Sequence, residues 1–350
     1  MKALVYALSE DYAQATGGFV YNQRLVAELE GRGWRISRLV LPAGFPRPSD
    51  DARAKTAALL AALPVGTLLL TDQLCIDTVP EIAAAAGRRL RLVTIVHHPL
   101  AAEGDGPRDE ASALHQSEKA ALRHAALVVA TSHTTAQTLR DDYAVDPGRL
   151  VVAPPGSDAQ PRSPGSGDGG PVALLGVGAI VPRKGHDRLV AALAGVRDLD
   201  WRLTLAGDLD RAPEHVAQLH KTATEAGLAS RIAWLGEVAA PELEQLWRTA
   251  DVFVSASRHE GYGMAVAEAI ARGLPVITTA AGAIAEWLPA DVAELVASDD
   301  AAGFAAALRR VITYATHRTR LRSAATDFRH ALPGWSAAAA IVDRRLSTLH

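Results

Sequence analysis

Residues 252–279 read VFVSASRHEGYGMAVAEAIARGLPVITT. Two short apolar runs, 252–254 and 276–278, enclose a glycine-rich turn and a short apolar helical segment. Continuous apolar runs of this length are typical of parallel strands that are buried on both faces. The stretch therefore predicts a strand–loop–helix–strand unit of an α/β fold. It places one carboxylate, Glu260, before the turn and a second, Glu268, within the helix.

The same alternation of short strands and longer helical segments runs through both halves of the chain. Helix-length segments such as 21–31 and 187–196 separate the apolar runs. Such alternation predicts two open α/β domains, each a Rossmann-like, doubly wound parallel sheet. The predicted strands are 3–8, 36–41, 67–70, 92–96, 127–130, 150–153, 173–177, 202–206, 232–235, 252–254, 276–278 and 294–296.

The clearest break in composition is AQPRSPGSGDGG at residues 159–170. Pro, Ser and Gly do not support helix or strand interiors, so this segment is interpreted as a linker. It separates a first domain at 1–160 from a second at 171–334. A final helix at about 335–350 follows a Leu-Pro-Gly break and is expected to pack back on the first domain.

Composition excludes several classes of protein. The 350 residues are 49% apolar and 21% charged, as in a globular protein, and the net charge of −3 gives no electrostatic argument for nucleic acid binding. A single cysteine, Cys75, allows no disulfide within the chain and suits a reducing cytoplasm. The N-terminal apolar run is too short for a signal peptide. No stretch reaches the roughly 18 apolar residues of a membrane-spanning helix.

Loops that follow strands are the places to look for chemistry, because doubly wound sheets bind ligands beyond the carboxyl ends of their strands. Gly17 and Gly18 follow the first strand, where paired glycines let the backbone approach an anionic ligand. A plain β–α turn explains the pair equally well. The segment is not GxGxxG, and no acidic residue ends the second strand, which counts against dinucleotide binding.

Two further loops carry polar side chains. His97 and His98 stand at the tip of a strand and could donate hydrogen bonds, act as a base, or be structural. No other ligands at suitable spacing favour a zinc site. Arg183 and Lys184 open a helix after the strand at 173–177, which favours phosphate binding over the alternative of a solvated basic turn.

The opening stretch combines a backbone cradle with two carboxylates. Gly261 and Gly263 keep the turn slim, so N–H groups of 261–264 can point at a ligand. Glu260 would repel a phosphate, so it is expected to accept hydrogen bonds from hydroxyls or to support a developing positive charge. Glu268 lies about two helical turns further on and can meet other hydroxyls. Each glutamate alone would be read as solvated, but together they suit a nucleotide sugar.

These motifs resemble those of a known family. The Glu260-x7-Glu268 spacing, followed by GLPVI, resembles the signature of the retaining glycosyltransferases of family 4, which have the GT-B fold. Other segments match the family in order: TGGFVYNQRLVAEL, SHTTAQTLRDDYAVDPGRLVVAPPGSD, LLGVGAIVPRKGHDRLVAAL, LTLAGD and LGEVAAPELEQLWRTADVFVSAS. The resemblance implies two domains facing a cleft. It also implies metal-independent, cofactor-free transfer of a sugar from a nucleoside-diphosphate sugar to a hydroxyl, with retention of anomeric configuration.

The resemblance also assigns roles. Glu260 would hold the donor sugar, Lys184 the diphosphate and Glu268 the ribose. His98 would contact the donor sugar, with His97 as the competing candidate. The remaining donor-site residues would be Gly17 and Gly18 over the phosphates, the amides of Gly261, Tyr262, Gly263 and Met264 at the sugar and diphosphate, and Gly236, Glu237 and Val238 facing the base.

Two departures from the family pattern stand out. The usual Asn-Gly-Val-Asp is Pro-Gly-Ser-Asp at 155–158. The arginine that usually follows the glycine at 178 is Ala179 here. Either Arg183 turns inward as its substitute, or the leaving diphosphate receives less charge compensation.

Several alternatives remain open on the sequence. Asp208 and Asp210 form a DxD, interpreted as a solvated loop rather than a metal site. A phosphorylase or epimerase of the same architecture, an NAD-dependent oxidoreductase and a non-catalytic nucleotide-sugar binder are the rival functions. The donor base could be that of UDP, GDP or ADP. The acceptor, expected at loops such as 99–108, could be a soluble small molecule or glycan, or a lipid that brings the protein to the membrane surface.

Overall fold

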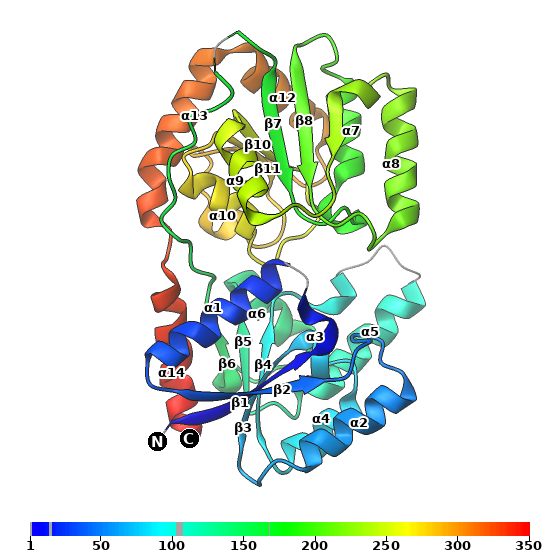
Figure 1. The fold of residues 1–350 in the computed structure, drawn as a ribbon, viewed down its shortest axis with the longest axis vertical. Coiled ribbons are helices and arrows are strands. Elements are labelled where there is room, and N and C mark those ends of the chain that lie inside the picture. Colours follow the sequence, from blue (N-terminus) through cyan, green and yellow to red (C-terminus); the bar gives the residue numbers. More distant parts are fainter. Residues whose placement is uncertain (1, 14–15, 103–107, 168) are drawn as a thin grey trace. The chain divides into compact units, whose positions relative to one another are not determined.

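The computed structural model describes residues 2–13, 16–102, 108–167 and 169–350. Contacts divide the chain into two compact units. The first combines Met1–Gly156 with Pro333–His350, and the second is Ser157–Leu332. The described residues of each unit form one six-stranded sheet in which every pairing is parallel (Figure 1).

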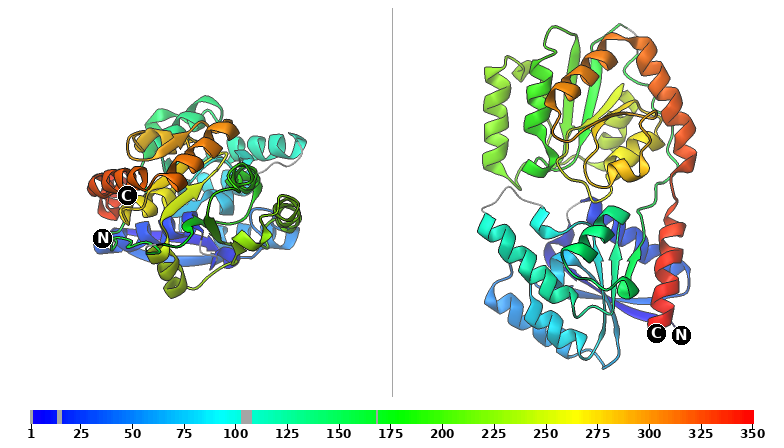
Figure 2. Two further views of the ribbon diagram at one scale, coloured as in Figure 1. Left: turned by 90° about the horizontal axis from the view of Figure 1, so that it is seen from above. Right: turned by 180° about the vertical axis from the view of Figure 1, so that it is seen from behind.

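The first unit has the strand order β2-β1-β3-β4-β5-β6. Helices lie on both faces of this sheet (Figures 1 and 2). The strands are β1 (Ala3–Ser9), β2 (Arg35–Leu41), β3 (Leu68–Asp72), β4 (Arg91–Val96), β5 (Leu127–Ala130) and β6 (Leu150–Val152). The helices are η1 (Glu10–Ala13), α1 (Gly17–Gly31), α2 (Asp50–Ala61), α3 (Gln73–Ile76), α4 (Pro80–Gly87), η2 (Leu100–Ala102), α5 (Arg108–Leu122), α6 (His133–Asp141), η3 (Pro147–Arg149) and α14 (Trp335–Leu349).

The second unit has the order β12-β11-β10-β7-β8-β9. The strands are β7 (Val172–Val177), β8 (Trp201–Ala206), β9 (Ile232–Trp234), β10 (Val252–Ser255), β11 (Val276–Thr279) and β12 (Glu294–Val296). The helices are η4 (Pro182–Lys184), α7 (His186–Ala194), α8 (Pro213–Glu225), η5 (Ala229–Arg231), α9 (Ala240–Thr249), α10 (Met264–Ala271), α11 (Ile284–Trp287), α12 (Ala301–Thr313), α13 (Ala315–Phe328) and η6 (Arg329–Ala331).

Neighbouring residues of the central strands enter different cores. Along β10, Val252 and Val254 belong to a buried cluster with α7 and α12, whereas Phe253 belongs to a second cluster with α9 and α10. Side chains of a strand alternate between its two faces, so both faces of this sheet are covered. The continuous apolar runs of the sequence report this double burial.

The structure confirms the predicted fold class, and all twelve predicted strands are found with ends that shift by at most two residues. The expectation that every strand is buried on both faces is wrong for β2, in which Arg35, Ser37 and Val40 are exposed. The reason is topological, because β2 is an edge strand and charged residues protect such edges from further pairing. Helix α1 also starts at Gly17, four residues earlier than predicted.

The segment predicted as a linker, 159–170, belongs to the second unit where it is described. The Ser163 hydroxyl donates to the carbonyls of Trp247 and Arg248 at 2.8 and 3.1 Å, near the end of α9. The Ser163 amide donates to the Arg272 carbonyl at 2.9 Å. The composition correctly excluded helix and strand, but these side-chain and backbone bonds hold the segment against the second unit.

Helix α14 packs in the first unit beside α1, on the side where the chain ends meet (Figure 1). The ring of its first residue, Trp335, lies edge-on to the ring of Tyr21 at 6.0 Å. Gly156 lies against the start of this helix, and a Cβ there would stand 2.2 Å from the Trp335 amide nitrogen. The joint between β6 and α14 therefore requires glycine at 156.

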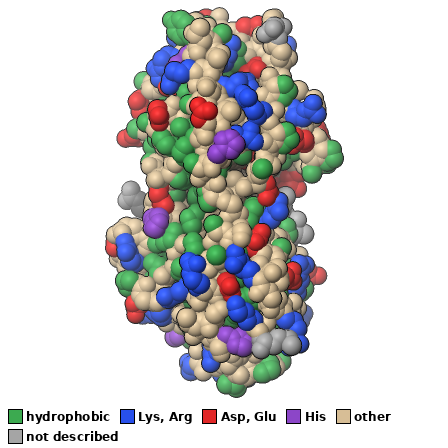
Figure 3. Space-filling model, turned by 90° about the vertical axis from the view of Figure 1, so that its left-hand side faces the viewer, with side chains coloured by type: hydrophobic (Ala, Val, Ile, Leu, Met, Phe, Trp, Pro, Cys, Tyr) green, Lys and Arg blue, Asp and Glu red, His purple; other side chains and the backbone are tan. Residues whose placement is uncertain are grey.

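Surface charge is mixed in sign. Figure 3 shows blue Lys and Arg and red Asp and Glu side chains scattered over one face, in line with the net charge of −3. Within the described ranges, no helix combines the length and apolar character that crossing a membrane requires.

The order of the strands fixes where a ligand can bind. In the second sheet the chain moves outward through β8 and β9 and then returns to β10 on the other side of β7. The loops after β7 and β10 thus diverge to opposite faces at a topological switch point, the usual ligand site of doubly wound sheets. In the first sheet the corresponding point lies between β1 and β3.

The Gly156 contact gives a stability prediction. We expect Gly156→Ala to destabilise the protein by roughly 1–3 kcal/mol, because the added methyl group overpacks the start of α14. Gly31→Ala is the matched control, since a Cβ at Gly31 meets nothing within 4 Å. Denaturant unfolding measures both. Equal stability of the two variants would contradict the described packing.

Candidate active site

The loops after β7 and β10 are tied together at the switch point. The Arg258 amide donates to the Arg183 carbonyl at 2.8 Å, and the Arg258 guanidinium binds both carboxylate oxygens of Asp187 at 2.9 and 2.6 Å. Gly185 adopts φ +65°, and a Cβ there would lie 2.0 Å from the Ala256 carbonyl oxygen. Only glycine permits this approach, and the approach brings Lys184 to Glu260.

The Glu260 carboxylate is the centre of the cluster. Its Oε1 accepts hydrogen bonds from Lys184 Nζ and from Ser257 Oγ, each at 2.7 Å. Its Oε2 lies 3.7 Å from Arg183 Nη1. Glu260 is only 7% exposed, and the Arg183 side chain is 12% exposed. Two cations and one hydroxyl therefore converge on one buried carboxylate.

The charges decide the protonation state of Glu260. Burial alone would raise its pKa, but the charges of Lys184 and Arg183, with the hydrogen bonds from Lys184 and Ser257, outweigh burial and lower the pKa to about 2. The group is ionised at neutral pH. Because two cations share one anion, the cluster keeps one positive charge that an anionic ligand could use.

The turn before α10 offers backbone rather than side chains. Helix α10 starts at Met264, and its N-cap residue Gly263, with φ +93°, has no side chain that could cap the helix. A Cβ at Gly263 would meet Ile284 Cγ1 at 2.9 Å. The ring of Tyr262 stacks on Trp287 at 5.3 Å and is buried. The uncapped helix N-terminus after Gly261 favours an anion.

The predicted base-facing segment lies at the same edge of the sheet. The Gly178 amide donates to the Ala206 carbonyl and the Gly207 amide to the Gly236 carbonyl, at 2.9 and 2.8 Å. The loops after β7, β8 and β9 are thereby joined by their backbones. Beyond Gly236, Glu237 is exposed and Val238 is half-buried.

Glu268 lies in α10 with 37% of its side chain exposed. Its Oε1 accepts a hydrogen bond from Arg272 Nη2 at 3.1 Å. Burial raises the pKa of Glu268, and the neighbouring Arg272 opposes that rise. Ala179, in the loop after β7, brings no charge. In the same loop, Arg183 Nη1 lies 3.7 Å from Glu260 Oε2 and donates to the His259 carbonyl at 3.0 Å.

In the first unit the glycine pair meets a histidine. A Cβ on Gly18 would stand 2.9 Å from His97 Cδ2, and the Tyr21 ring lies edge-on to His97 at 5.4 Å. Gly17 is the first residue of α1, with Thr16 as N-cap. His98, the residue preferred on the sequence, is buried at 8% exposure. The structure thus brings the competing candidate, His97, against Gly18.

Two buried polar residues contact the Glu260 carboxylate and the segment after His98, and neither was among the predicted site residues. Ser257, three residues before Glu260, is fully buried and donates to its carboxylate; a serine at that spacing was the available signal. Glu118 of α5 is buried and accepts the amides of Leu100 and Ala101 at 2.8 and 3.3 Å, just after the histidines. Nothing in its amphipathic helix marked it.

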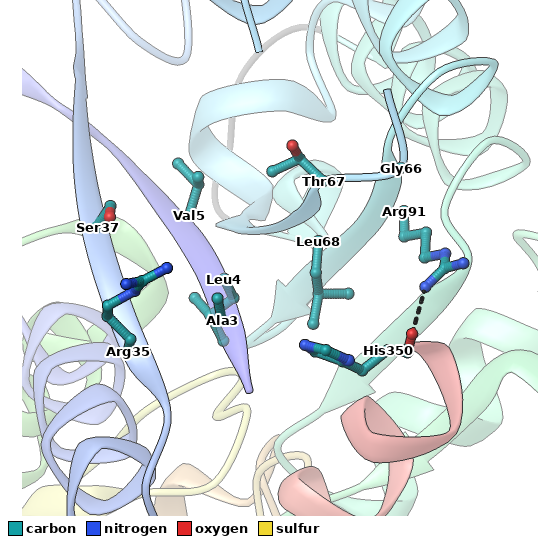
Figure 4. A pocket seen from close by; sticks show the side chains of 10 residues that line it. All are labelled: Ala3, Leu4, Val5, Arg35, Ser37, Gly66, Thr67, Leu68, Arg91 and His350. Carbon is teal, nitrogen blue, oxygen red and sulfur yellow. Dashed lines mark hydrogen bonds between the residues drawn. The ribbon is translucent and has the colours of Figure 1, made fainter. Parts of the chain in front are cut away.

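A cavity of about 240 Å³ lies elsewhere, at the amino ends of strands in the first unit. Figure 4 shows residues from the starts of β1, β2 and β4 around it, with Arg91 bonded to the His350 carbonyl at 3.0 Å. Doubly wound sheets bind ligands at the opposite, carboxyl edge. Chemistry and topology therefore favour the cluster around Glu260 over this cavity.

The side chain of Asp208, the first residue of the DxD, makes its contacts within its own turn. Asp208 Oδ1 accepts the Asp210 amide at 2.7 Å, and Asp208 Oδ2 lies 3.3 Å from Arg211 Nε. In the part of the chain that the structure describes, no three His, Cys, Asp or Glu side chains gather as metal ligands. The predicted acceptor loop, 99–108, falls partly on 103–107, which lie outside the described residues.

Comparison with known proteins decides the family. A sequence model described as "Glycosyl transferases group 1" matches residues 171–314, and one described as "Glycosyltransferase Family 4" matches 76–160. The chain belongs to glycosyltransferase family 4. The resemblance drawn from the Glu260-x7-Glu268 motif is confirmed.

Curated relatives are similar over part of their length. The D-inositol 3-phosphate glycosyltransferase of Stackebrandtia nassauensis is 33% identical over 58% of this chain and 49% of the relative. The enzyme of the same name from Thermomonospora curvata is 31% identical over 70% of this chain and 61% of the relative. The chain spans about half the length of the first such relatives.

Solved structures share the whole fold. Sucrose-phosphate synthase from Thermosynechococcus elongatus superposes with a TM-score of 0.81 at 20% identity, covering 100% of this chain and 99% of that one. HepE of Anabaena, solved with UDP-glucose, gives 0.78 at 19% identity, covering 99% and 100%. The fold is GT-B, as the sequence predicted.

The lowered pKa of Glu260 predicts how stability depends on pH. A carboxyl group with a folded pKa of about 2 stabilises the protein fully above its ordinary value of about 4.5, and this stabilisation disappears as pH falls through about 2. We expect the stability difference between wild type and Glu260→Gln to shrink by about 2 kcal/mol between pH 5 and pH 3. Urea unfolding at each pH measures it. Exposed Glu237→Gln is the charge-removal control. A difference that is independent of pH would refute the ion-pair assignment.

Proposed function

We propose that this protein transfers a sugar from a nucleoside-diphosphate sugar to a hydroxyl acceptor, with retention of anomeric configuration and without a metal or cofactor. The observation that carries the proposal is the buried Glu260 carboxylate, held between Lys184 and Arg183 beside the uncapped N-terminus of α10. One cluster thus holds both a carboxylate that can accept hydrogen bonds from sugar hydroxyls and groups that can bind an anion.

The chemistry divides the donor among these groups. The diphosphate suits Lys184 and the amides at the start of α10, where a cation and a helix N-terminus both favour negative charge. Glu260 is ionised, so it can accept hydrogen bonds from the sugar hydroxyls next to the reacting carbon. Glu268 is assigned to the ribose at the other end of the donor.

Transfer requires the leaving diphosphate to be stabilised. The bond from the anomeric carbon to the diphosphate oxygen breaks, and the acceptor oxygen bonds to the same carbon on the same face. The acceptor proton passes to the departing diphosphate. Lys184, Arg183 and the α10 amides would stabilise the charge that develops on the diphosphate, which is the function a metal serves in other phosphate sites. This supports the expectation that no metal is needed.

The relatives suggest where to look for substrates. HepE was solved with UDP and with UDP-glucose, so UDP-sugars are the first donors to test, followed by GDP- and ADP-sugars. Two relatives are named for D-inositol 3-phosphate and for mannosylfructose phosphate. Phosphorylated polyols and hexoses are therefore the first acceptors to test, with lipid acceptors next. A cytoplasmic location, expected from the single cysteine, remains part of this proposal.

Donor binding and transfer can be measured directly. We expect one of UDP-, GDP- or ADP-glucose to stabilise the protein by about 2.7 kcal/mol at a concentration 100 times its Kd. Glu260→Gln should lower transfer by about 10²–10³-fold, as expected for loss of a transition-state contact. NMR of the new linkage should show a retained anomer, and EDTA should leave the rate unchanged.

Five outcomes would count against the proposal. An inverted anomer would refute retention, and loss of activity in EDTA would refute metal independence. Unchanged transfer in Glu260→Gln would refute the site. Donor binding without transfer or hydrolysis would favour the rival reading as a nucleotide-sugar binder, and visible absorbance from a pyridoxal cofactor would favour a phosphorylase.

The replacement of the usual arginine at 179 allows a rescue experiment. If Arg183 supplies the second cation of the diphosphate site, Arg183→Gln should lower kcat/KM by about 100-fold. Adding Ala179→Arg to that variant should then restore at least tenfold, because a cation returns to the same loop. Arg188→Gln is the control, since its guanidinium binds the Ser298 carbonyl. No loss in Arg183→Gln would show that the diphosphate needs only Lys184.

A further inference from the structure

Arg272 is a buried cation with no place in the proposed chemistry. It lies directly after α10, where its amide donates to the carbonyls of Glu268 and Ala269 at 3.1 and 3.2 Å. The residue is 4% exposed. Arginine is rarely buried to this extent unless its charge is paired. Its partners therefore indicate what it does.

The guanidinium of Arg272 lies between two carboxylates. Nη2 lies 3.1 Å from Glu268 Oε1 and 2.8 Å from Glu244 Oε2, and Nη1 donates to Glu244 Oε1 at 3.1 Å. The group also lies over the ring of Trp247, 5.4 Å from its centroid. The bidentate pair with Glu244 and the packing on Trp247, both from α9, fix the plane of the guanidinium.

A fixed guanidinium fixes Glu268 in turn. Arg272 engages only Oε1, and among the described residues no hydrogen bond reaches Glu268 Oε2. Burial raises the pKa of Glu268, the hydrogen bond and charge of Arg272 lower it, and the negative charges of Glu244 and Asp158 add to the rise. A carboxylate held at one oxygen and open at the other is suited to accept a hydrogen bond from a hydroxyl.

We propose that Arg272 is the positioning residue of the ribose site: held by Glu244 and Trp247, it orients Glu268 so that Oε2 accepts a hydrogen bond from a ribose hydroxyl of a nucleoside diphosphate. This inference rests on the proposed function, which assigns the ribose to Glu268. It adds a chain of contacts from α9 through Arg272 to the ligand.

The competing role is structural. A cation at the C-terminal end of a helix stabilises the helix through its dipole, and removing Arg272 could weaken the whole site through lost stability alone. If Arg272 had only a structural role, its removal would weaken the binding of every nucleotide by the same factor. The positioning role acts only through the ribose hydroxyls, so comparing two ligands separates the two roles.

The experiment is calorimetric titration with UDP and with 2′,3′-dideoxy-UDP, which lacks both ribose hydroxyls. If GDP or ADP binds wild type more tightly, it and its dideoxy analogue replace this pair. Wild type should prefer the hydroxylated nucleotide by about tenfold, the value of one hydrogen bond to a charged group. In Arg272→Met the preference should disappear, through weaker binding of the hydroxylated ligand only. Glu268→Gln should also lose the preference. The double variant Arg272→Met/Glu268→Gln should bind the hydroxylated nucleotide no more weakly than either single variant.

Two further variants keep the test decisive. If Arg272→Met does not fold, Arg272→Lys retains the charge at the helix end without the planar fork, and its preference should also fall. Arg309→Met is the control, because Arg309 of α12 makes a similar bidentate pair with Asp198, which lies between α7 and β8. The nucleotide preference of this variant should stay at the wild-type value. If the Arg272 variants bind both ligands more weakly by the same factor, or keep the wild-type preference, this inference is overturned and the proposed function is not. Failure of wild type to bind UDP, GDP and ADP would overturn the proposed function with it.

Discussion

The interaction on which the second unit depends is the buried contact of Glu260 with Lys184, Ser257 and Arg183. A carboxylate this buried would be costly without partners, and removing one partner of a buried pair typically costs about 3–5 kcal/mol. The contact joins the loop after β7 to the loop after β10, and it leaves one positive charge in excess. The same interaction therefore holds the site together and makes it attractive to an anion.

Glycines make that interaction geometrically possible. Gly185 allows the two loops to touch, and a Cβ on Gly282 would stand 2.2 Å from the Glu260 carbonyl oxygen. Gly263, at positive φ, turns the chain into α10 without a side-chain cap. The backbone comes close to itself on both sides of the carboxylate, and the strand order places all three turns at one edge of the sheet. A ligand at that edge would meet fixed groups, which reduces the ordering cost of binding.

The sequence was sufficient for the strands, the doubly wound sheets and the family, because apolar runs and the Glu260-x7-Glu268 spacing are local signals. It failed where contacts join distant segments. Lys184 and Glu260 were given separate partners, although they bind each other across 76 positions. Ser163 was read as part of a linker, because composition does not show that its hydroxyl reaches the end of α9. Of the two adjacent histidines the sequence favours His98, whereas the contact of His97 with Gly18 appears only in three dimensions.

The cluster around Glu260 is where we expect the diphosphate of a nucleotide sugar to bind. The most direct measurement is a crystal structure of the full chain with the nucleoside diphosphate that stabilises it most. We expect phosphate oxygens within hydrogen-bond distance of Lys184 Nζ and of an amide at the start of α10, with the ribose at Glu268. A diphosphate bound at the cavity around Arg35 and Arg91, or one that makes no contact with Lys184, would refute this assignment.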